Sequence, residues 1–152
     1  MLKKTVLALI ALFIVIQFIP YGKDHTNPPV VAEPQWDTPK TRELFMRACG
    51  DCHSNETKWP SYSNIAPISW FVYKHVEEGR EHFNVSMWGV QKKNKGDEAA
   101  EELEEGEMPL ASYLLAHPEA RLSAEEKAAL IQGLKNTFGQ EDEEHEEEGE
   151  DD

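Results

Sequence analysis

The chain has 152 residues, which gives room for one compact domain with extensions at its ends, and it contains only two cysteines. Its net charge of −14 argues against a nucleic acid as partner, because an acidic protein and a phosphate backbone repel each other. The charge is uneven: residues 141–152 hold ten acidic side chains, so the rest of the chain carries only −4. An ordinary domain is therefore expected before a strongly acidic end.

The N-terminus begins with the basic residues Lys3 and Lys4, and an apolar run over residues 5–19 follows that only Gln17 interrupts. This pattern is typical of a secretory signal. Because no small-x-small cleavage site and no cysteine for lipidation follow, we expect residues 1–21 to be kept as a single-pass signal-anchor in the cytoplasmic membrane of a bacterium. A helix of this length reaches about 25 Å, short of the ~30 Å hydrocarbon layer, so the span requires local thinning. The rest of the chain would then lie on the periplasmic side.

Residues 22–36 hold three prolines among polar residues and are expected to form an extended tether that holds the domain away from the bilayer. A helix is predicted next, capped by Asp37 or Thr38 and started by Pro39. Its apolar face is formed by Leu44, Phe45 and Ala48.

Both cysteines lie in the run Cys49-Gly50-Asp51-Cys52-His53, a C-x-x-C-H pattern that signals covalent attachment of c-type haem. Thiols three positions apart lie on the same side of one helical turn, so each can add to one vinyl group of a porphyrin. His53 would then lie under the iron as its proximal ligand. The pattern predicts one covalent haem c.

Three other interpretations of the cysteines remain open. A thioredoxin-like redox pair needs strand–helix alternation around the motif, and the sequence shows no such pattern. A zinc site needs a fourth ligand at close spacing, and the adjacent Cys52 and His53 are awkward partners on one tetrahedral ion. A disulfide between Cys49 and Cys52 would close a very small loop and stabilise the domain little.

Residues 54–69 are rich in Asn, Ser and Pro and contain Trp59 and Tyr62, so they are expected to wrap irregularly around a large ligand and form a pocket wall. A backbone carbonyl near Pro67 is the expected acceptor for the second ring hydrogen of His53. A helix is predicted over residues 67–78, with Gly79 as its stop.

The predicted helix 67–78 carries His75 on its apolar side, where a histidine is more often a packed core residue than a ligand. His75 could still reach the iron from this position, and it is the alternative to Met108 as distal ligand. His82 and His117 rank lower, because they lie in polar or turn-like settings.

A further helix is predicted over residues 97–105, ending at Gly106, and the loop after it presents Met108 immediately before Pro109. Proline biases the preceding residue to an extended backbone, which aims the Met108 side chain inward. Met108 is the predicted distal iron ligand, although a methionine can also simply fill a gap in a core.

The last predicted helix covers residues 124–138 and begins with a capping box at Ser123. Gly133, next to its apolar stripe, either permits a close crossing with the first helix of the domain or is a tolerated exception to helix propensity. Residues 140–152 are expected to form a disordered acidic tail.

These residues resemble the family of small monohaem haem-binding domains of exported bacterial proteins, over residues 36–138. The resemblance is carried by Cys-Gly-Asp-Cys-His-Ser-Asn-Glu-Thr (49–57), Trp59-Pro60, Ile65-Ala66-Pro67-Ile68-Ser69-Trp70, His75-Val76-Glu77-Glu78-Gly79-Arg80, Gly106-Glu107-Met108-Pro109-Leu110, His117-Pro118 and Leu122-Ser123. The order of motifs is also distantly similar to small mono-haem cytochromes c. The resemblance implies thioether links at Cys49 and Cys52, with His53 and Met108 as axial ligands. Trp59-Pro60 and the run 65–70 do not match the cytochrome c pattern.

The sequence as a whole predicts an all-α, cytochrome c-like domain over residues 37–139, wrapped around one covalent haem. The predicted function is a membrane-tethered monohaem c-type cytochrome that carries single electrons to and from redox partner proteins at the membrane or in the periplasm. A His/Met pair closes both axial positions, which favours a carrier over a catalyst. If Met108 does not bind iron, an open distal site predicts a haem-based sensor or haem enzyme. A third alternative is an interaction module in which the acidic tail binds a basic partner.

Overall fold

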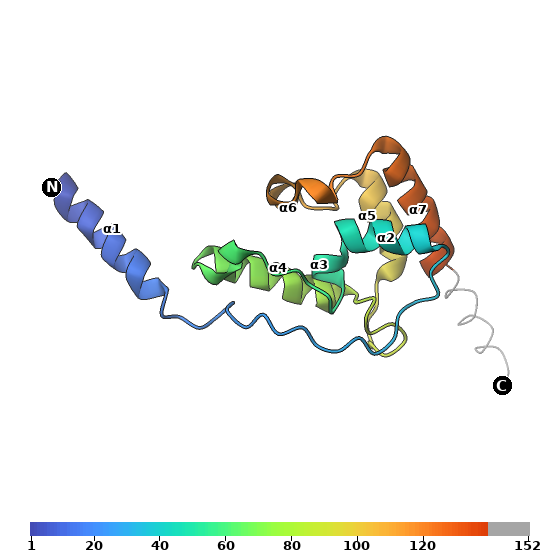
Figure 1. Ribbon diagram of the computed structural model, residues 1–152, viewed down its shortest axis with the longest axis horizontal. Helices are drawn as coiled ribbons and strands as arrows, with labels where there is room; N and C mark the ends of the chain where they lie inside the picture. The colour runs from blue at the N-terminus through green and yellow to red at the C-terminus, as the bar shows by residue number, and fades with distance from the viewer. Residues whose placement is uncertain (140–152) are drawn as a thin grey trace, which may run out of the picture.

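The computed structural model describes residues 1–139, which fold into helices with no strand (Figure 1). An isolated bridge between Ala32 and Met87 is the only β pairing in this range. The acidic tail predicted for residues 140–152 lies outside the described residues. The helices, with 3-10 turns labelled η, are α1 (Leu2–Ile16), α2 (Pro39–Ala48), α3 (Gly50–His53), η1 (Ser61–Asn64), α4 (Ile68–His82), η2 (Gly96–Glu98), α5 (Ala99–Glu105), α6 (Ala111–Ala116), η3 (Pro118–Ala120) and α7 (Ala124–Phe138).

The hydrophobic core lies where α2, α5 and α7 meet, at the right of Figure 1. Thr38 caps α2 as predicted, with its side chain accepting from the Thr41 N–H, and Pro39 takes the first helical position. Ser123 opens α7 with the predicted capping box. The buried side chains of this core are Leu44, Phe45, Phe83, Val85, Trp88, Ala100, Leu103, Leu130, Leu134 and Phe138.

Gly133 lies where α7 crosses α2, and the structure confirms the predicted close crossing. A Cβ atom placed on Gly133 would come within 2.3 Å of the Thr41 hydroxyl and 2.6 Å of its methyl group. Thr41 has no free space to move into, because it is buried and its hydroxyl lies 2.9 Å from that of Thr38. Glycine therefore sets the distance between the two helices.

Replacing Gly133 by alanine should destabilise the domain by about 1–3 kcal/mol, because the methyl group overpacks the crossing. Urea unfolding followed by circular dichroism measures this loss. A Thr41→Ala background removes the two closest obstructing atoms and leaves only the Cβ atom at 2.9 Å, so the same glycine replacement should lower stability less. Equal losses in both backgrounds would show that Thr41 does not set the spacing.

α4 is longer than predicted, because it continues through Gly79 and ends at His82. The prediction that Gly79 stops the helix is wrong. A Cβ atom on Gly79 would lie 2.7 Å from the Cys52 carbonyl oxygen and 2.9 Å from the Cys52 Cβ atom. The glycine is thus a contact point, where α4 approaches the backbone of α3 more closely than any side chain allows.

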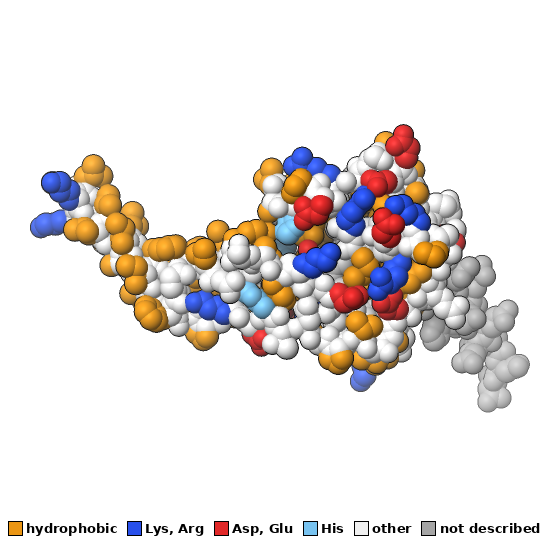
Figure 2. Space-filling model, in the orientation of Figure 1, with side chains coloured by type: hydrophobic (Ala, Val, Ile, Leu, Met, Phe, Trp, Pro, Cys, Tyr) orange, Lys and Arg blue, Asp and Glu red, His pale blue; other side chains and the backbone are white. Residues whose placement is uncertain are grey.

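α1 is an exposed apolar helix with the two lysines near its free end (Figure 2). It ends at Ile16, and the side chain of the next residue, Gln17, binds the backbone of Ala66, donating to its carbonyl at 2.9 Å and accepting from its N–H at 3.0 Å. Within residues 1–139 no helix is both long enough and apolar enough to cross a membrane. The single-pass anchor predicted for residues 1–21 is therefore not supported.

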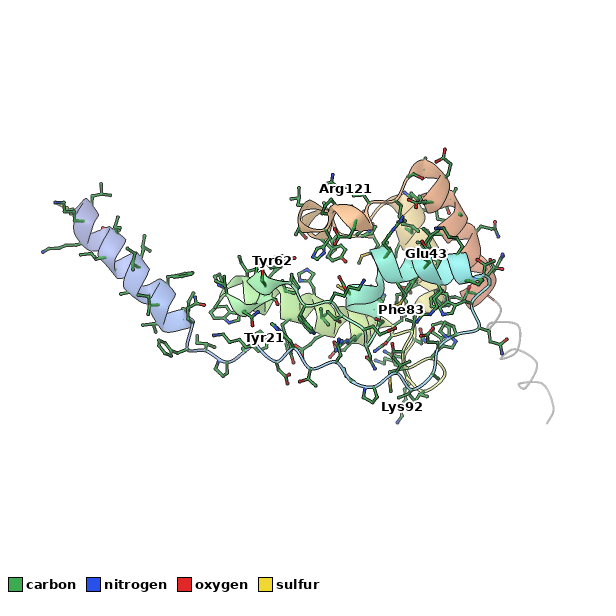
Figure 3. The ribbon with its side chains drawn as sticks, in the orientation of Figure 1. Tyr21, Glu43, Tyr62, Phe83, Lys92 and Arg121 are labelled. Carbon is green, nitrogen blue, oxygen red and sulfur yellow. The ribbon has the colours of Figure 1, made fainter. Side chains whose placement is uncertain are left out.

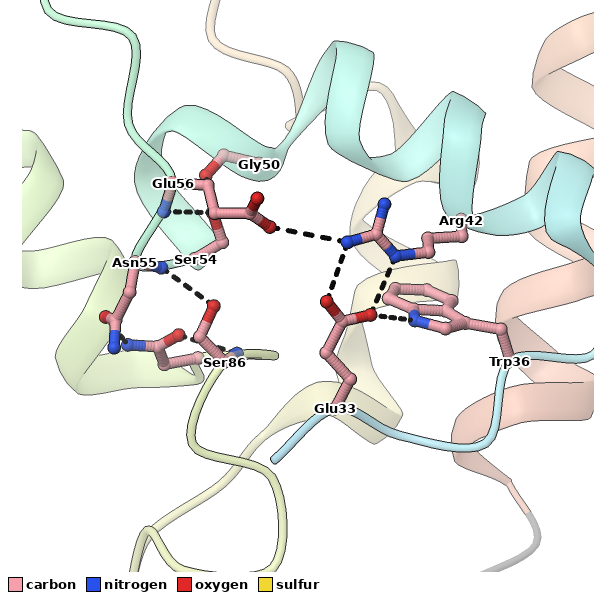
Figure 4. A network of polar contacts seen from close by, with 9 residues as sticks. Glu33, Trp36, Arg42, Gly50, Ser54, Asn55, Glu56 and Ser86 are labelled. Carbon is pink, nitrogen blue, oxygen red and sulfur yellow. Dashed lines mark hydrogen bonds and ion pairs between the residues drawn. The ribbon is translucent and has the colours of Figure 1, made fainter. Parts of the chain in front are cut away.

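Residues 27–36, which we call the strap, are extended as predicted but lie against the domain and do not stand clear of it (Figure 4). Glu33 binds the Arg42 guanidinium on α2 through both carboxylate oxygens, at 2.6 and 2.7 Å, and accepts from the Trp36 indole at 3.0 Å. Trp36 packs against Phe45 and Phe138 in the core. Residues 27–36 of the tether predicted for residues 22–36 are thus part of the folded domain.

Candidate functional site

The C-x-x-C-H run forms a short helical turn that continues from the end of α2. Cys49 is the residue between α2 and α3, and its N–H donates to the Phe45 carbonyl at 2.7 Å. The Cys49 carbonyl in turn accepts from the N–H groups of Cys52 and His53 at 3.1 and 3.0 Å. One turn of helix therefore presents both thiols and the imidazole from one compact segment, as the sequence predicted.

His53 is buried, with 9% of its surface exposed, and its ring contacts Phe83. Its Nδ1 lies 3.2 Å from the Phe83 carbonyl oxygen, and the two rings stack with centroids 4.2 Å apart. Because a carbonyl only accepts, Nδ1 carries the proton and Nε2 keeps its lone pair. Burial lowers the His53 pKa to about 4, so the ring is neutral, as a metal ligand must be.

The acceptor of the His53 proton differs from the prediction, which placed it near Pro67. Phe83 is the C-cap residue directly after α4, and the Val85 N–H donates to the His53 carbonyl at 2.9 Å. The segment that follows α4 therefore runs directly beside His53. The sequence carries no local signal for this contact, because it depends on where α4 ends.

The last turns of α4 hold the attachment segment from one side. Gly79 allows the close approach to Cys52 described above, and the Arg80 guanidinium donates to the Ser54 carbonyl at 2.9 Å and to the Thr57 hydroxyl at 2.9 Å. Burial lowers the pKa of Arg80, although the guanidinium remains charged. The sequence analysis did not predict that Gly79 and Arg80 contact the attachment segment. A glycine inside a helical pattern next to an arginine is the signal that could have found them.

A cavity of about 390 Å³ brings together the side chains predicted to bind haem. Cys49, Cys52, His53 and Met108 all line it. Most of the remaining wall is apolar, with charged and polar side chains among the lining residues. These other residues are Phe45, Ala48, His75, Glu78, Gly79, His82, Phe83, Lys95, Glu98, Ala99, Glu102, Leu103, Pro109, Leu110, Tyr113 and Leu134.

The two thiols are free and line this cavity. Burial raises the pKa of Cys49 to about 12 and that of Cys52 to about 11, so both are protonated at neutral pH. A thioredoxin-like pair needs the opposite shift, toward an accessible thiolate. Within residues 1–139 no three or more His, Cys, Asp and Glu side chains are grouped to hold a metal ion.

Met108 reaches the cavity from the loop after α5. Gly106 ends α5 with φ +82°, as predicted, and the Met108 N–H donates back to the Glu102 carbonyl at 3.1 Å. The Met108–Pro109 peptide bond is cis. The side chain is half-buried and belongs to the same cavity wall as His53, although the two residues lie on different elements.

His75 also lines the cavity, so the alternative distal ligand lies in the same region as Met108. Its Nδ1 donates to the Phe71 carbonyl at 2.8 Å, a bond within α4 that leaves Nε2 unprotonated. Trp59, predicted as a pocket wall, lines neither described cavity and stacks on His25 on the strap side. Tyr62 does line a second cavity, of about 410 Å³, which shares Cys52, His75, Leu110 and Tyr113 with the first.

Comparison with protein families matches residues 11–136 to a family described as a haem-binding domain. Neither the curated proteins nor the solved structures contain a match to the chain.

Proposed function

The chain belongs to the family of haem-binding domains, and from this premise we propose that it holds one covalent haem c and carries single electrons. Cys49 and Cys52 would form the thioether links, and His53 and Met108 would be the axial ligands. A haem bound in this way supplies one reversible electron at its iron. The protein side chains would position the haem and shield it from water.

The main support for this proposal is the tautomer and the position of His53. Its Nδ1 proton is bound to the Phe83 carbonyl, its Nε2 is unprotonated, and the ring lies in a cavity with both thiols. A hydrogen bond from the non-ligating nitrogen fixes the tautomer and orientation of a ligating histidine. The residues present therefore fit a haem attached at Cys49 and Cys52.

An apolar cavity with two protein ligands suits an electron carrier better than a catalyst. Phe45, Leu103, Leu110 and Leu134 exclude water around the ligands, which supports a raised reduction potential. The Met108 thioether, if bound to the iron, would occupy the position that oxygen or peroxide would need. At the cavity wall Glu98 is paired with Lys95 at 2.6 Å, so charges of both signs line it.

The proposed location is outside the cytoplasmic membrane, among redox partner proteins. Lys3 and Lys4 followed by the apolar residues 5–19 support export.

Protein produced with the c-type maturation machinery should gain the mass of one haem and give an alkaline pyridine haemochrome spectrum of the c type. Replacing both Cys49 and Cys52 by serine should abolish the mass increase, because no thioether can form. His75→Ala is the matched control for His53→Ala: the first should retain a low-spin spectrum and the second should lose it. Wild-type protein without covalent haem under these conditions would overturn the proposal.

A further inference from the structure

α6 is the helix that follows the Met108 loop, and it is weakly attached to the rest of the domain. It buries none of its residues, and among the described helices its backbone packs against η3 alone (Figure 1). Side-chain hydrogen bonds tie it down: the Arg121 guanidinium donates to the Leu114 carbonyl at 3.1 Å, and two tyrosine hydroxyls make the other contacts. Tyr113 donates to Asp51 at 2.7 Å, and Tyr62, on the η1 turn below α6 in Figure 3, lies 2.7 Å from Nε2 of His117.

Asp51 is a fixed acceptor within the attachment motif, immediately before Cys52. Its Oδ1 accepts from the Lys58 N–H at 2.9 Å, and its backbone carbonyl accepts from the Thr57 hydroxyl at 2.6 Å. Oδ2 is the oxygen that accepts from Tyr113. The carboxylate is therefore held in place before α6 contributes anything, which makes it a rigid point of attachment.

Tyr113 lies between the two cavities and lines both of them. Its ring stacks on that of His117 with centroids 4.2 Å apart and planes 14° apart, so the side chain has one defined direction. Burial and the bond to Asp51 raise its pKa above the ordinary value, so the hydroxyl stays protonated and donates. A hydrogen bond to a carboxylate is about twice as strong as one between neutral groups.

The Met108 loop is consequently held at both ends. On its N-terminal side, the Met108 N–H donates to the Glu102 carbonyl of α5. On its C-terminal side, the Tyr113 hydroxyl donates to Asp51 of the attachment segment. We propose that Tyr113 is a positioning residue, whose hydrogen bond to Asp51 holds Met108 at the wall of the cavity that it shares with His53. This inference rests on the proposed His53 and Met108 ligation.

Tyr113→Phe keeps the ring and its stack on His117 and removes only the hydroxyl, so it tests the bond to Asp51. In ferric holoprotein, added imidazole competes with Met108 for the iron, and loss of the sulfur-to-iron absorption band reports the displacement. Removal of a hydrogen bond to a charged group should lower the imidazole concentration at half-displacement by roughly tenfold. Covalent haem content, measured by intact mass, should stay equal to that of the wild type.

Tyr62→Phe is the matched control, because it removes the hydroxyl contact to His117, the residue after α6, and leaves the bond between Tyr113 and Asp51 in place. It should change the half-displacement concentration by less than about twofold. An effect equal to that of Tyr113→Phe would overturn the inference, since the whole helix would then act as a unit. Asp51→Ala also removes the contact to the Lys58 N–H, so it should lower the half-displacement concentration at least as much as Tyr113→Phe does. In the Asp51→Ala background Tyr113→Phe should add nothing; additive effects would likewise overturn the inference.

The experiment distinguishes the ligation by Met108 from the positioning role of Tyr113. Wild-type protein that lacks the sulfur-to-iron band would overturn the ligation by Met108 itself. A wild-type band that is displaced at the same imidazole concentration in Tyr113→Phe would overturn only the role of Tyr113.

Discussion

Replacing Met108 by leucine is expected to abolish the sulfur-to-iron absorption band and to lower the reduction potential by on the order of 0.1 V or more, within the ~0.8 V that axial ligands span. Leucine is close to methionine in volume and equally apolar, so the wall beside Pro109 and Leu110 should remain filled. It cannot bind iron. The ferric protein should therefore turn high-spin or take up an external ligand, which optical spectroscopy and spectroelectrochemistry measure.

Met87→Leu is the control, because Met87 pairs with the strap at Ala32 and lines neither described cavity. Its spectrum and potential should equal those of the wild type. If Met108→Leu remains low-spin and becomes high-spin only together with His75→Ala, then His75 replaces the methionine or is the native ligand. A wild-type protein that is already high-spin would favour the sensor or haem enzyme over the carrier.

Replacing Gly79 by alanine is expected to destabilise the domain by about 2 kcal/mol and to lower the yield of covalent haem. Alanine favours a helix by up to ~1 kcal/mol over glycine, so propensity alone predicts the opposite sign. The loss comes from a Cβ atom 2.7 Å from the Cys52 carbonyl, a backbone atom that cannot move without displacing the attachment turn. Thermal unfolding of the holoprotein and intact mass measure the two effects.

Glu81→Ala, an exposed replacement two residues further along α4, is the control for a change in helix propensity without a new contact. It should leave stability within about 0.5 kcal/mol of the wild type and haem yield unchanged. If Gly79→Ala stabilises the protein, the contact between α4 and the Cys52 backbone is looser than the structure indicates.

The helices with strong local signals were predictable from the sequence. Thr38 with Pro39, and Ser123 with Glu126, fix the starts of α2 and α7 through contacts within one turn. Gly106 ends α5 through its own backbone angle. Such signals need no knowledge of the rest of the fold, which is why these boundaries agree with the structure.

The features that the sequence did not predict all depend on contacts between distant segments. Gly79 was interpreted as a helix stop, but its conformation is helical and its role is to approach Cys52. The carbonyl that orients His53 belongs to Phe83, thirty residues away along the chain. No local pattern distinguishes a glycine that ends a helix from one that packs against another backbone.

The candidate site could be predicted in part from local patterns. The C-x-x-C-H spacing and the methionine–proline pair identified Cys49, Cys52, His53 and Met108, and the structure brings all four to one cavity. Their roles as haem attachment points and iron ligands stay predictions. Trp59 was chosen for its aromatic character alone, which does not specify the direction of a side chain, and it lies on the strap side.

The strap changes where the cooperative folding unit begins. Asn27 donates to the Thr57 carbonyl at 2.9 Å, Asn55 donates to the Pro29 carbonyl at 2.8 Å, and the Val31 N–H donates to the Ser86 carbonyl at 2.9 Å. A fragment cut at Trp36 would leave these partners, which flank both His53 and the segment beside it, exposed to solvent. The smallest autonomous unit therefore begins near Asn27, and amide hydrogens of the strap should exchange as slowly as those of the helices it crosses.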